Sequence, residues 1–388
     1  MRFNHATLLL MAMFLAIAST ALASATWYVN GLSGSDSNNC MSAQTACKTI
    51  GHAISLASAG DSIRVAAATY KENLTIGASL NMLGSNANTT IIDGGGVNTV
   101  VTVSNATAHV TLSNVTIRNG RARQGGGIYN NGMLTIGSSI ISGNSAVGPG
   151  GNGGGIFNAG TVTINNSTLS NNSGRGTASG GLGGGIDNAG TVTVNKCTFT
   201  GNTVSGVFGA GFGGGIGNSG TATVNNSTLS GNSATAWGGG IGNEGNLRIN
   251  NSTISGNKAG LQGGDIFNYS GFTATLQNSI VANSSSGGNC FGTMTSKGYN
   301  LSSDNTCNFN GTGDMNQTDP RLGPLQNNGG PTQTMALPSG SLAIDAGNPS
   351  GCTDGLGHLL NTDQRGKPRP DTEDTSGCDM GAYERQGD

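Results

Sequence analysis

Charged and aromatic residues are scarce in this chain of 388 residues, where they make up only 9% and 5% of the sequence. The formal net charge of -2 excludes the basic field that binding to nucleic acid or to an anionic membrane surface would need. Intrinsic disorder is excluded as well, because the low hydrophobic content comes without a high net charge and with only 8 prolines. So few aromatic residues also argue against one thick globular core and favour thin layers of Ile, Val and Leu.

Long apolar runs are missing except at the N-terminus, where one covers residues 8–18. Basic residues precede this run, and small residues spaced for signal cleavage follow it at positions 21–25. Because the run is too short to span a membrane, we interpret residues 1–25 as a removed secretory signal peptide rather than a buried helix. The sequence therefore predicts a secreted or cell-surface protein without a membrane span after signal removal.

Export places the chain in an oxidising compartment, where cysteine spacing becomes informative. Six of the seven cysteines lie in local pairs, and proximity suggests three disulfides, although sequence alone leaves other pairings open: Cys40–Cys47, Cys290–Cys307 and Cys352–Cys378. No pair has the spacing or the histidine partners of a zinc site. The seventh cysteine, Cys197, stands where other repeats have Ser167, Ser227 and Ser252, and we interpret it as a small buried thiol rather than a nucleophile.

Glycine and asparagine are abundant, with 69 and 46 residues, and both belong to a repeat of 25 to 30 residues. The motif Gly-Gly-x-Ile recurs six times between Ile128 and Ile266, and it is followed by alternating runs such as Thr161-Val162-Thr163-Ile164. Period-two alternation marks strands with one buried face, and the glycine clusters mark turns. Three short strands per repeat, without helical periodicity, predict an all-β fold, a single-stranded right-handed parallel β-helix (solenoid).

Asparagine occupies two fixed positions in these repeats. Successive turns of a parallel solenoid stack about 4.8 Å apart, so equivalent residues lie above one another. A repeated charge would repel itself at every step, whereas stacked amides donate and accept hydrogen bonds in a continuous series. We therefore predict two structural ladders, one of Asn130, Asn158, Asn188, Asn218, Asn243 and Asn268, and one of Asn144, Asn172, Asn202, Asn232 and Asn257.

Both ends of a solenoid expose unpaired strand edges that need covering. Residues 48–59 have apolar side chains at helical spacing and predict a helix over the N-terminal opening. Beyond residue 310 the repeat gives way to a segment rich in Pro, Asp and Gly, which predicts an irregular C-terminal cap. The expected organisation is a β-helix with its N-terminal cap over residues 26–310 and a cap segment over residues 311–388.

Motifs at both ends of the mature chain carry a family resemblance. The start is similar to secreted pectin-lyase-like right-handed β-helix proteins through Trp27-Tyr28-Val29-Asn30, Gly60-Asp61-Ser62-Ile63 and Thr90-Ile91-Ile92-Asp93-Gly94. The end resembles the choice-of-anchor Q domain of bacterial surface and secreted proteins through Asn328-Gly329-Gly330-Pro331-Thr332 and Cys378-Asp379-Met380-Gly381. The Gly-Gly-x-Ile units resemble repeats of polymorphic outer-membrane proteins. The resemblance implies an exported bacterial β-helix protein and leaves its chemistry undefined.

Proteins of the resembled fold include calcium-dependent polysaccharide lyases and polygalacturonases, which need clustered carboxylates and, in the lyases, a base. The carboxyls of Asp187, Glu244 and Asp265 fall in different repeat positions or in non-adjacent turns, which argues against a catalytic pair. We interpret the remaining candidates as turn, ladder or solvated-loop residues: Asp93, His109, Asp371, Glu373 and Asp374. We expect no cofactor, and Ca²⁺ only if the protein is a lyase.

Length variation between repeats is concentrated at one corner, between the closing Asn and the next glycine cluster. Insertions at one corner of a solenoid stack into a wall, which is often a binding face. Aromatic faces with sparse basic groups suit a neutral or weakly acidic glycan; alternatively, the rings fold down and hold the loops together. The candidate glycan-binding residues of this wall are Arg121, Arg123, Arg175, Phe208, Phe212, Trp237 and Lys258.

The sequence thus predicts an exported, monomeric scaffold without chemistry of its own. It would bind an extracellular polysaccharide or a cell surface in the manner of an adhesin. The alternative is a pectate-lyase-like polysaccharide lyase or a glycoside hydrolase. The two hypotheses differ in whether acids and a base gather on one outer face of the solenoid.

Overall fold

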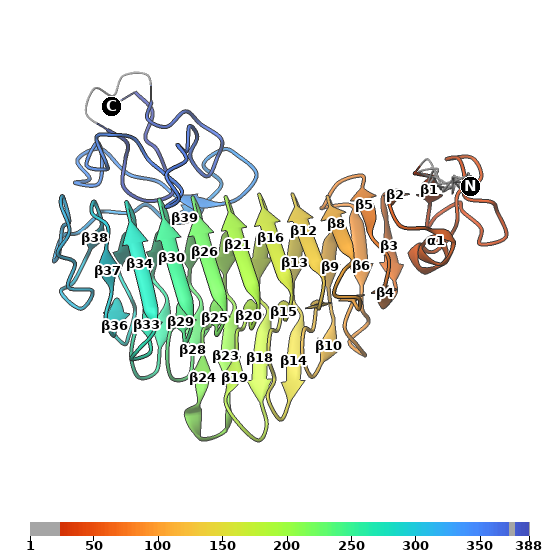
Figure 1. Ribbon diagram of the computed structural model, residues 1–388, viewed down its shortest axis with the longest axis horizontal. Coiled ribbons are helices and arrows are strands. Elements are labelled where there is room, and N and C mark those ends of the chain that lie inside the picture. The colour runs from red at the N-terminus through yellow and green to blue at the C-terminus, as the bar shows by residue number, and fades with distance from the viewer. Residues whose placement is uncertain (1–23, 372–376, 388) are drawn as a thin grey trace, which may run out of the picture.

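The computed structural model describes residues 24–371 and 377–387, so the predicted signal peptide lies outside it except for its last two residues. The chain winds into a parallel β-helix whose turns stack along one axis (Figure 1). Three long parallel sheets, A, B and C, form its sides, and within a turn the chain passes through C, A and B in that order. The predicted all-β solenoid is confirmed.

Sheet A has eleven strands: β1 (Thr26–Val29), β2 (Asp61–Val65), β5 (Leu80–Gly84), β8 (His109–Ser113), β12 (Met133–Gly137), β16 (Thr161–Asn165), β21 (Thr191–Asn195), β26 (Thr221–Asn225), β30 (Asn246–Asn250), β34 (Thr273–Gln277) and β37 (Thr295–Ser296). Sheet B has ten: β3 (Ala68–Lys71), β6 (Thr90–Asp93), β9 (Thr116–Arg118), β13 (Ile140–Ser142), β17 (Thr168–Ser170), β22 (Thr198–Thr200), β27 (Thr228–Ser230), β31 (Thr253–Ser255), β35 (Ile280–Ala282) and β38 (Leu301–Ser302). Sheet C has nine: β4 (Leu74–Ile76), β7 (Val101–Val103), β11 (Ile128–Asn130), β15 (Ile156–Asn158), β20 (Ile186–Asn188), β25 (Ile216–Asn218), β29 (Ile241–Asn243), β33 (Ile266–Asn268) and β36 (Cys290–Phe291).

The core consists of stacked rows of apolar side chains, because alternation turns every second residue inward. In β16, Val162 and Ile164 are fully buried, whereas Thr161 at the start of the strand is exposed. Val162 lies in register with Val192 of the next turn, so similar side chains stack over one another. One continuous apolar cluster therefore runs along the axis from the first turns to the last.

Asparagine side chains are hydrogen-bonded from turn to turn inside two corners. In the first ladder, the Asn158 Nδ2 donates to the Asn188 Oδ1 at 2.7 Å, and the same contact joins each neighbouring pair from Asn130 to Asn268. In the second, the amides from Asn144 to Asn257 are joined at 2.9–3.0 Å, and the series ends on the carboxyl of Asp265. Each buried amide is thus satisfied by its copy in the next turn.

A third asparagine series lies on the outer side of the corner after sheet A, where sequence reasoning did not place one. Its members, which are partly or fully buried, are Asn165, Asn195, Asn225 and Asn250.

The N-terminal end carries the helix α1 (Ile50–Leu56), which is shorter than the predicted range of 48–59. Its Ile50 and Ala53 are fully buried in the end of the apolar core. The carboxylate of Glu72 accepts hydrogen bonds from the first two amides of the helix, at 2.9 and 2.8 Å, where the positive end of the helix dipole favours an anion. The helix is therefore held to the turn that contains Glu72.

The described residues of the C-terminal segment are irregular, as predicted, and form only the strands β39 (Leu325–Gln326) and β40 (Thr334–Met335). It lies along the flank of the coil at the corner between sheets A and B, rather than over the open end (Figure 1). The Gln364 side chain, for example, bonds the hydroxyl of Thr228, and the Ala382 amide bonds that of Thr253. Cys307 and Phe309, just before this segment, are buried in the last part of the core and close that end.

The structure contains the three disulfides that proximity suggested, Cys40–Cys47, Cys290–Cys307 and Cys352–Cys378. Among the described residues no helix has both the length and the apolar character needed to cross a membrane.

Candidate functional site

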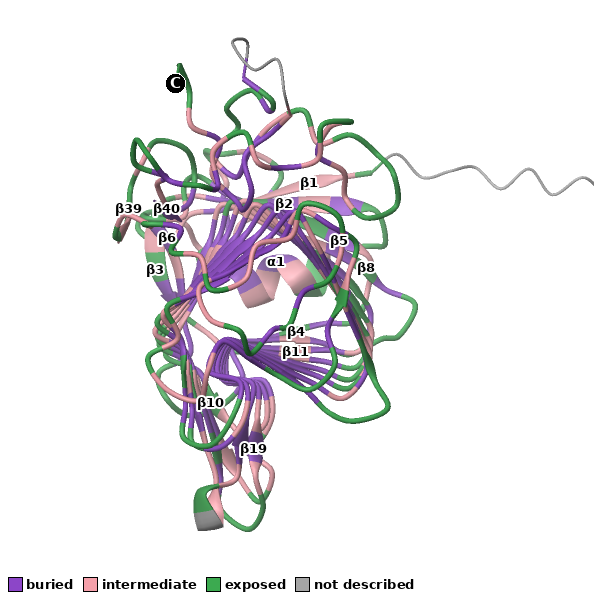
Figure 2. Ribbon diagram, turned by 90° about the vertical axis from the view of Figure 1, so that its left-hand side faces the viewer, coloured by how far each residue is buried: buried purple, intermediate pink, exposed green. Residues whose placement is uncertain are grey.

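The corner with variable length forms a fourth short sheet, so the prediction of three strands per repeat is incomplete. Six consecutive turns add a strand to this sheet D: β10 (Arg121–Ala122), β14 (Ser145–Gly148), β18 (Ser173–Gly176), β23 (Thr203–Ser205), β28 (Ser233–Ala234) and β32 (Lys258–Ala259). The chain then folds back beside sheet D, in two turns as β19 (Gly181–Leu182) and β24 (Gly211–Phe212), with the 3-10 helix η1 (Val207–Gly209) at one tip. This two-layered projection, the fin, extends from the coil in Figure 2.

The returning layer of the fin presents one residue per turn in a continuous row. Each of these residues comes immediately before a glycine cluster, and backbone bridges or hydrogen bonds link it to its neighbours: Gln124, Asn152, Leu182, Phe212, Trp237 and Gln262. The glycine that follows turns the chain back toward sheet C. At Gly183, for instance, φ is +61°, and a Cβ would lie 2.1 Å from a backbone oxygen.

The structure separates the predicted wall residues onto two faces of the fin. Arg121 and Lys258 occupy one register row of sheet D, and Arg175 lies two residues further along the same face; all three are exposed. Residues that alternate with them, such as Ala146 and Val204, are buried between the layers.

The aromatic members belong to the other layer. Phe212 is buried, Trp237 is half-buried, and both lie in the returning row. Arg123 is exposed at the end of β10, and the Phe208 side chain lies outside what the structure describes. The expected combination of rings and cations on one surface is therefore not present in the part of the fin that is described.

Sheet C presents a second row on its outer face. By alternation, the residue between the inward Ile and the inward Asn of each strand points outward. In register, these residues are Tyr129, Phe157, Asp187, Gly217, Gly242, Phe267 and Phe291. Rings stack at both ends of the row, with centroids 5.2 Å apart for Tyr129 and Phe157 and 5.3 Å apart for Phe267 and Phe291.

A groove lies between the returning layer of the fin and sheet C. It holds about 350 Å³ and is lined by both rows and by the turns after β29 and β33: Gly180, Gly181, Leu182, Ala210, Phe212, Trp237, Glu244, Gln262, Phe267 and Tyr269. Phe267 contacts the fin rings, at centroid distances of 5.8 Å to Phe212 and 6.0 Å to Trp237. A concave aromatic surface with a few polar groups is typical of a ligand site.

Two glycines of sheet C make room for the fin. A Cβ on Gly242 would lie 2.7 Å from the ring of Phe212, closer than side-chain atoms pack. A Cβ on Gly217, which is in register with Gly242, would lie 2.9 Å from the backbone nitrogen of Gly183 in the returning layer. Phe212 therefore fills the interruption in the aromatic row, and this contact is why it is buried.

Aromatic rings remain exposed where the groove opens toward the C-terminal turns. Tyr269 is 52% exposed, Phe272 44% and Phe291 42%. Tyr269 and Phe272 contact each other, and Tyr269 also contacts Phe267 on the groove wall. A soluble protein seldom groups exposed rings without a binding role.

Two carboxyl groups line one narrow cavity beside the groove, which shares Leu182, Phe212 and Glu244 with the groove. Asp187 comes from β20 and Glu244 from the turn after β29, and both line this cavity together with Leu182 and Phe212. Asp187 is only 3% exposed, and it has no hydrogen bond or ion pair among the described residues. Burial raises the pKa of Asp187 to about 7 and also raises the pKa of Glu244.

Sequence reasoning had placed Asp187 and Glu244 apart, because they hold different repeat positions two turns from each other. Two strand spacings are about 10 Å, and two side chains can extend across that distance into the same cavity. The two acids thus hold different repeat positions, as expected, and nevertheless line the same cavity. The third repeat carboxyl, Asp265, ends the second asparagine ladder, where it is fully buried and its Oδ2 has no partner among the described residues.

The remaining candidates have structural surroundings. Asp93 forms an ion pair with Arg118 at 2.9 Å; partial burial opposes ionisation, but hydrogen bonds from the Gly95 amide, Arg118 and Asn119 lower the pKa of Asp93 overall. His109 is exposed on sheet A. Of the tail acids, Asp371 is buried, while Glu373 and Asp374 lie outside the described residues.

Cys197 is fully buried, and its backbone amide bonds the hydroxyl of Ser227 in the next turn, at 3.0 Å. Burial raises the pKa of its thiol to about 12, which keeps it protonated and unreactive.

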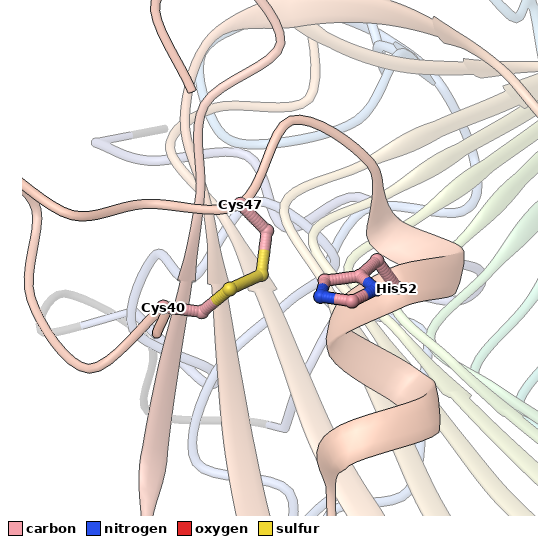
Figure 3. A group of neighbouring side chains, drawn as sticks. All are labelled: Cys40, Cys47 and His52. Carbon is pink, nitrogen blue, oxygen red and sulfur yellow. A yellow bond between two sulfur atoms is a disulfide. The ribbon is translucent and has the colours of Figure 1, made fainter. Parts of the chain in front are cut away.

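Figure 3 shows Cys40, Cys47 and His52 close together near α1. Both sulfurs are bonded to each other, so the group has no thiolate to offer a metal.

No family model and no curated protein matches this chain. Among solved structures it is similar to the pectate lyase Pel9A, with 17% identity, a TM-score of 0.49, and coverage of 94% of this chain and 98% of that one. It is also similar to the pectin methylesterase PemA from Erwinia chrysanthemi and to a pectin methylesterase in complex with a hexasaccharide, with 15% and 14% identity. Both of these have a TM-score of 0.31 and cover 72% of this chain and 80% of theirs. Those activities belong to the compared proteins.

Proposed function

We propose that this protein is an exported scaffold that binds an extracellular polysaccharide in the groove between the fin and sheet C. The observation that carries the proposal is the grouping of Trp237, Phe212, Phe267 and Tyr269 on the two walls of one open groove. Aromatic faces suit the apolar C–H faces of sugar rings, and burying them together removes apolar surface from water.

The length of the site supports a polymer rather than a single sugar. The outward row of sheet C extends over six strand spacings from Tyr129 to Phe291, or about 29 Å. Rings at both ends of this row would contact successive units of an extended chain. Three disulfides support a location outside the cell, as a secreted or surface-displayed protein.

The experiment is retention in affinity gels that contain a panel of polysaccharides. Trp237→Ala should weaken binding at least tenfold, roughly 1.4 kcal/mol or more, because it removes a groove ring without touching the core. Arg121→Ala, on the opposite face of the same fin, is the matched control and should bind like the wild type. Binding that is unchanged in Trp237→Ala, or that is lost equally in Arg121→Ala, would refute the groove as the site.

A second candidate function, glycoside hydrolysis, is favoured by the shared cavity of Asp187 and Glu244. A pair of carboxyl groups beside a glycosidic bond, one protonated and one ionised, can serve as general acid and base for attack by water. Hydrolysis would be established if the wild type releases new reducing ends from a polysaccharide and the Asp187→Asn variant does not. If the wild type binds a polysaccharide and releases no new ends from it, the protein is a binding scaffold.

A further inference from the structure

Carboxyl groups border the groove without compensating basic groups. Glu244 lines the groove, Asp187 and Glu244 line the small cavity beside it, and none of the described residues that line the groove or this cavity is Lys, Arg or His. Of the basic residues of the fin, Arg121, Arg175 and Lys258 occupy the opposite face of sheet D. The two layers of the fin separate these cations from anything bound in the groove.

We propose that the groove selects uncharged polysaccharides and rejects polymers of uronic acids, with Asp187 and Glu244 as the residues that determine this specificity. The inference rests on the proposed function and adds the class of polymer to it. It narrows the expectation of a neutral or weakly acidic glycan to the neutral one.

The physical reason is the cost of bringing a carboxylate into this site. A uronate would lose water on entering a groove walled by rings, and no cation is present among the lining residues to replace that hydration. It would also be repelled by any ionised form of Glu244 or Asp187, in surroundings where charges are less screened than in water.

A neutral sugar avoids both costs. Its hydroxyl groups can donate to a carboxylate or accept from a protonated carboxyl, and the Glu244 side chain, which lines the groove, has no hydrogen bond or ion pair among the described residues. The hydrogen-bonding capacity of Glu244 is therefore available to a ligand in the groove.

The test compares polymers that differ only in charge. Neutral polysaccharides that bind the wild type in affinity gels, for example a mixed-linkage glucan or a galactomannan, are oxidised at their C6 hydroxymethyl groups to the corresponding uronates. The wild type should bind each oxidised polymer at least about tenfold more weakly than its parent. The double variant Asp187→Asn/Glu244→Gln keeps the shape of both side chains. It should bind the oxidised polymer no more than about threefold more weakly than the neutral parent.

The outcomes separate the inference from the proposed function. Equal or tighter binding of the oxidised polymer, abolished by Trp237→Ala, would overturn the selectivity while leaving the groove as the binding site. Undiminished discrimination in the double variant would overturn the role of the two carboxyls. Absence of binding to any polymer, charged or neutral, would refute the proposed function and the inference with it. Arg175→Ala is the control for general charge effects and should discriminate like the wild type.

Discussion

On the flank covered by the C-terminal segment, a buried acid is paired with a base, whereas beside the fin the buried Asp187 is not paired. Arg369 and Glu384 meet at 2.6 Å with both side chains fully buried, and Arg369 also bonds Asn226 of the coil. Asp187 is almost as buried, yet it has neither an ion pair nor a hydrogen bond among the described residues. Charges buried for packing are normally paired, so an unpaired carboxyl beside an open aromatic groove points to a ligand.

The largest effect is expected on the paired flank. Arg369→Met should lower the free energy of unfolding by about 3–5 kcal/mol, because it leaves the buried carboxyl of Glu384 and the amide oxygen of Asn226 without the guanidinium that they bond. Urea unfolding followed by circular dichroism measures this loss. Arg369→Met/Glu384→Leu, which removes both charges, should recover most of the stability. If both variants are equally destabilised, packing rather than charge pairing holds this flank.

Removal of the ionisable group of Asp187 should stabilise the fold, in contrast to the loss expected for Arg369→Met. Burial raises its pKa from 3.8 to about 7, so the folded chain favours the protonated form, and the wild type loses stability as pH rises from about 4 to about 7. Asp187→Asn removes this loss and should gain up to about 4 kcal/mol over the wild type between these limits, at 1.36 kcal/mol per pKa unit.

Glu244, the other titratable group that faces this cavity, is present in both proteins and cancels in their difference. The measurement is the urea midpoint of each protein at several pH values. A difference between wild type and variant that does not change with pH would show that Asp187 does not titrate in the folded chain.

The asparagine ladders belong to the coil that both flanks share, and an intermediate effect is expected there. The Asn188 Nδ2 donates to Asn218, Gly190 and Thr221 inside the first ladder, at 2.7 to 3.1 Å. Asn188→Ala should cost about 1–3 kcal/mol, because it leaves buried acceptors without a partner. Asn195→Ala, which changes a half-buried member of the outer series, is the control and should cost less, since water can replace its contacts. Equal losses in thermal unfolding would contradict the role of burial.

The smallest effect is expected on the outer face of the fin. Arg175→Ala removes an exposed cation and should change stability by less than about 0.5 kcal/mol. Its retention on polysaccharides should equal that of the wild type. A loss comparable to that of Trp237→Ala would place the ligand on the cationic face and reverse the comparison of the two faces.

The coil could be predicted from the sequence because the residue pattern of each repeat indicates where its strands and turns lie. Alternating Thr and Val at 161–164 determines which residues face inward, and the glycine clusters determine where the chain turns. The fourth strand of each turn could not be seen, since segments such as Ser173–Gly176 have no apolar alternation. What holds them is backbone pairing with their own copies in the next turn.

Only part of the groove could be predicted from the sequence. Trp237 and Phe212 stood out as aromatic residues in the variable corner, but Tyr129, Phe157 and Phe267 were overlooked. Their signal was available: each lies between an inward Ile and an inward Asn, so alternation turns it outward. The repeat pattern did not indicate that the fin folds back beside sheet C. That arrangement depends on Gly242, which leaves room for the ring of Phe212, and on Gly217, which leaves room for the backbone of Gly183.

The most direct test of the central claim uses the fluorescence of Trp237, because the chain contains only 2 tryptophans. Addition of a polysaccharide that binds in affinity gels should shift the emission of the wild type to shorter wavelength and protect it from acrylamide, in a saturable way, as a sugar covers the half-buried indole. Trp237→Phe, which retains only Trp27, should show neither change. Binding in the gel with unaltered emission and unaltered quenching of the wild type would place the ligand outside the groove.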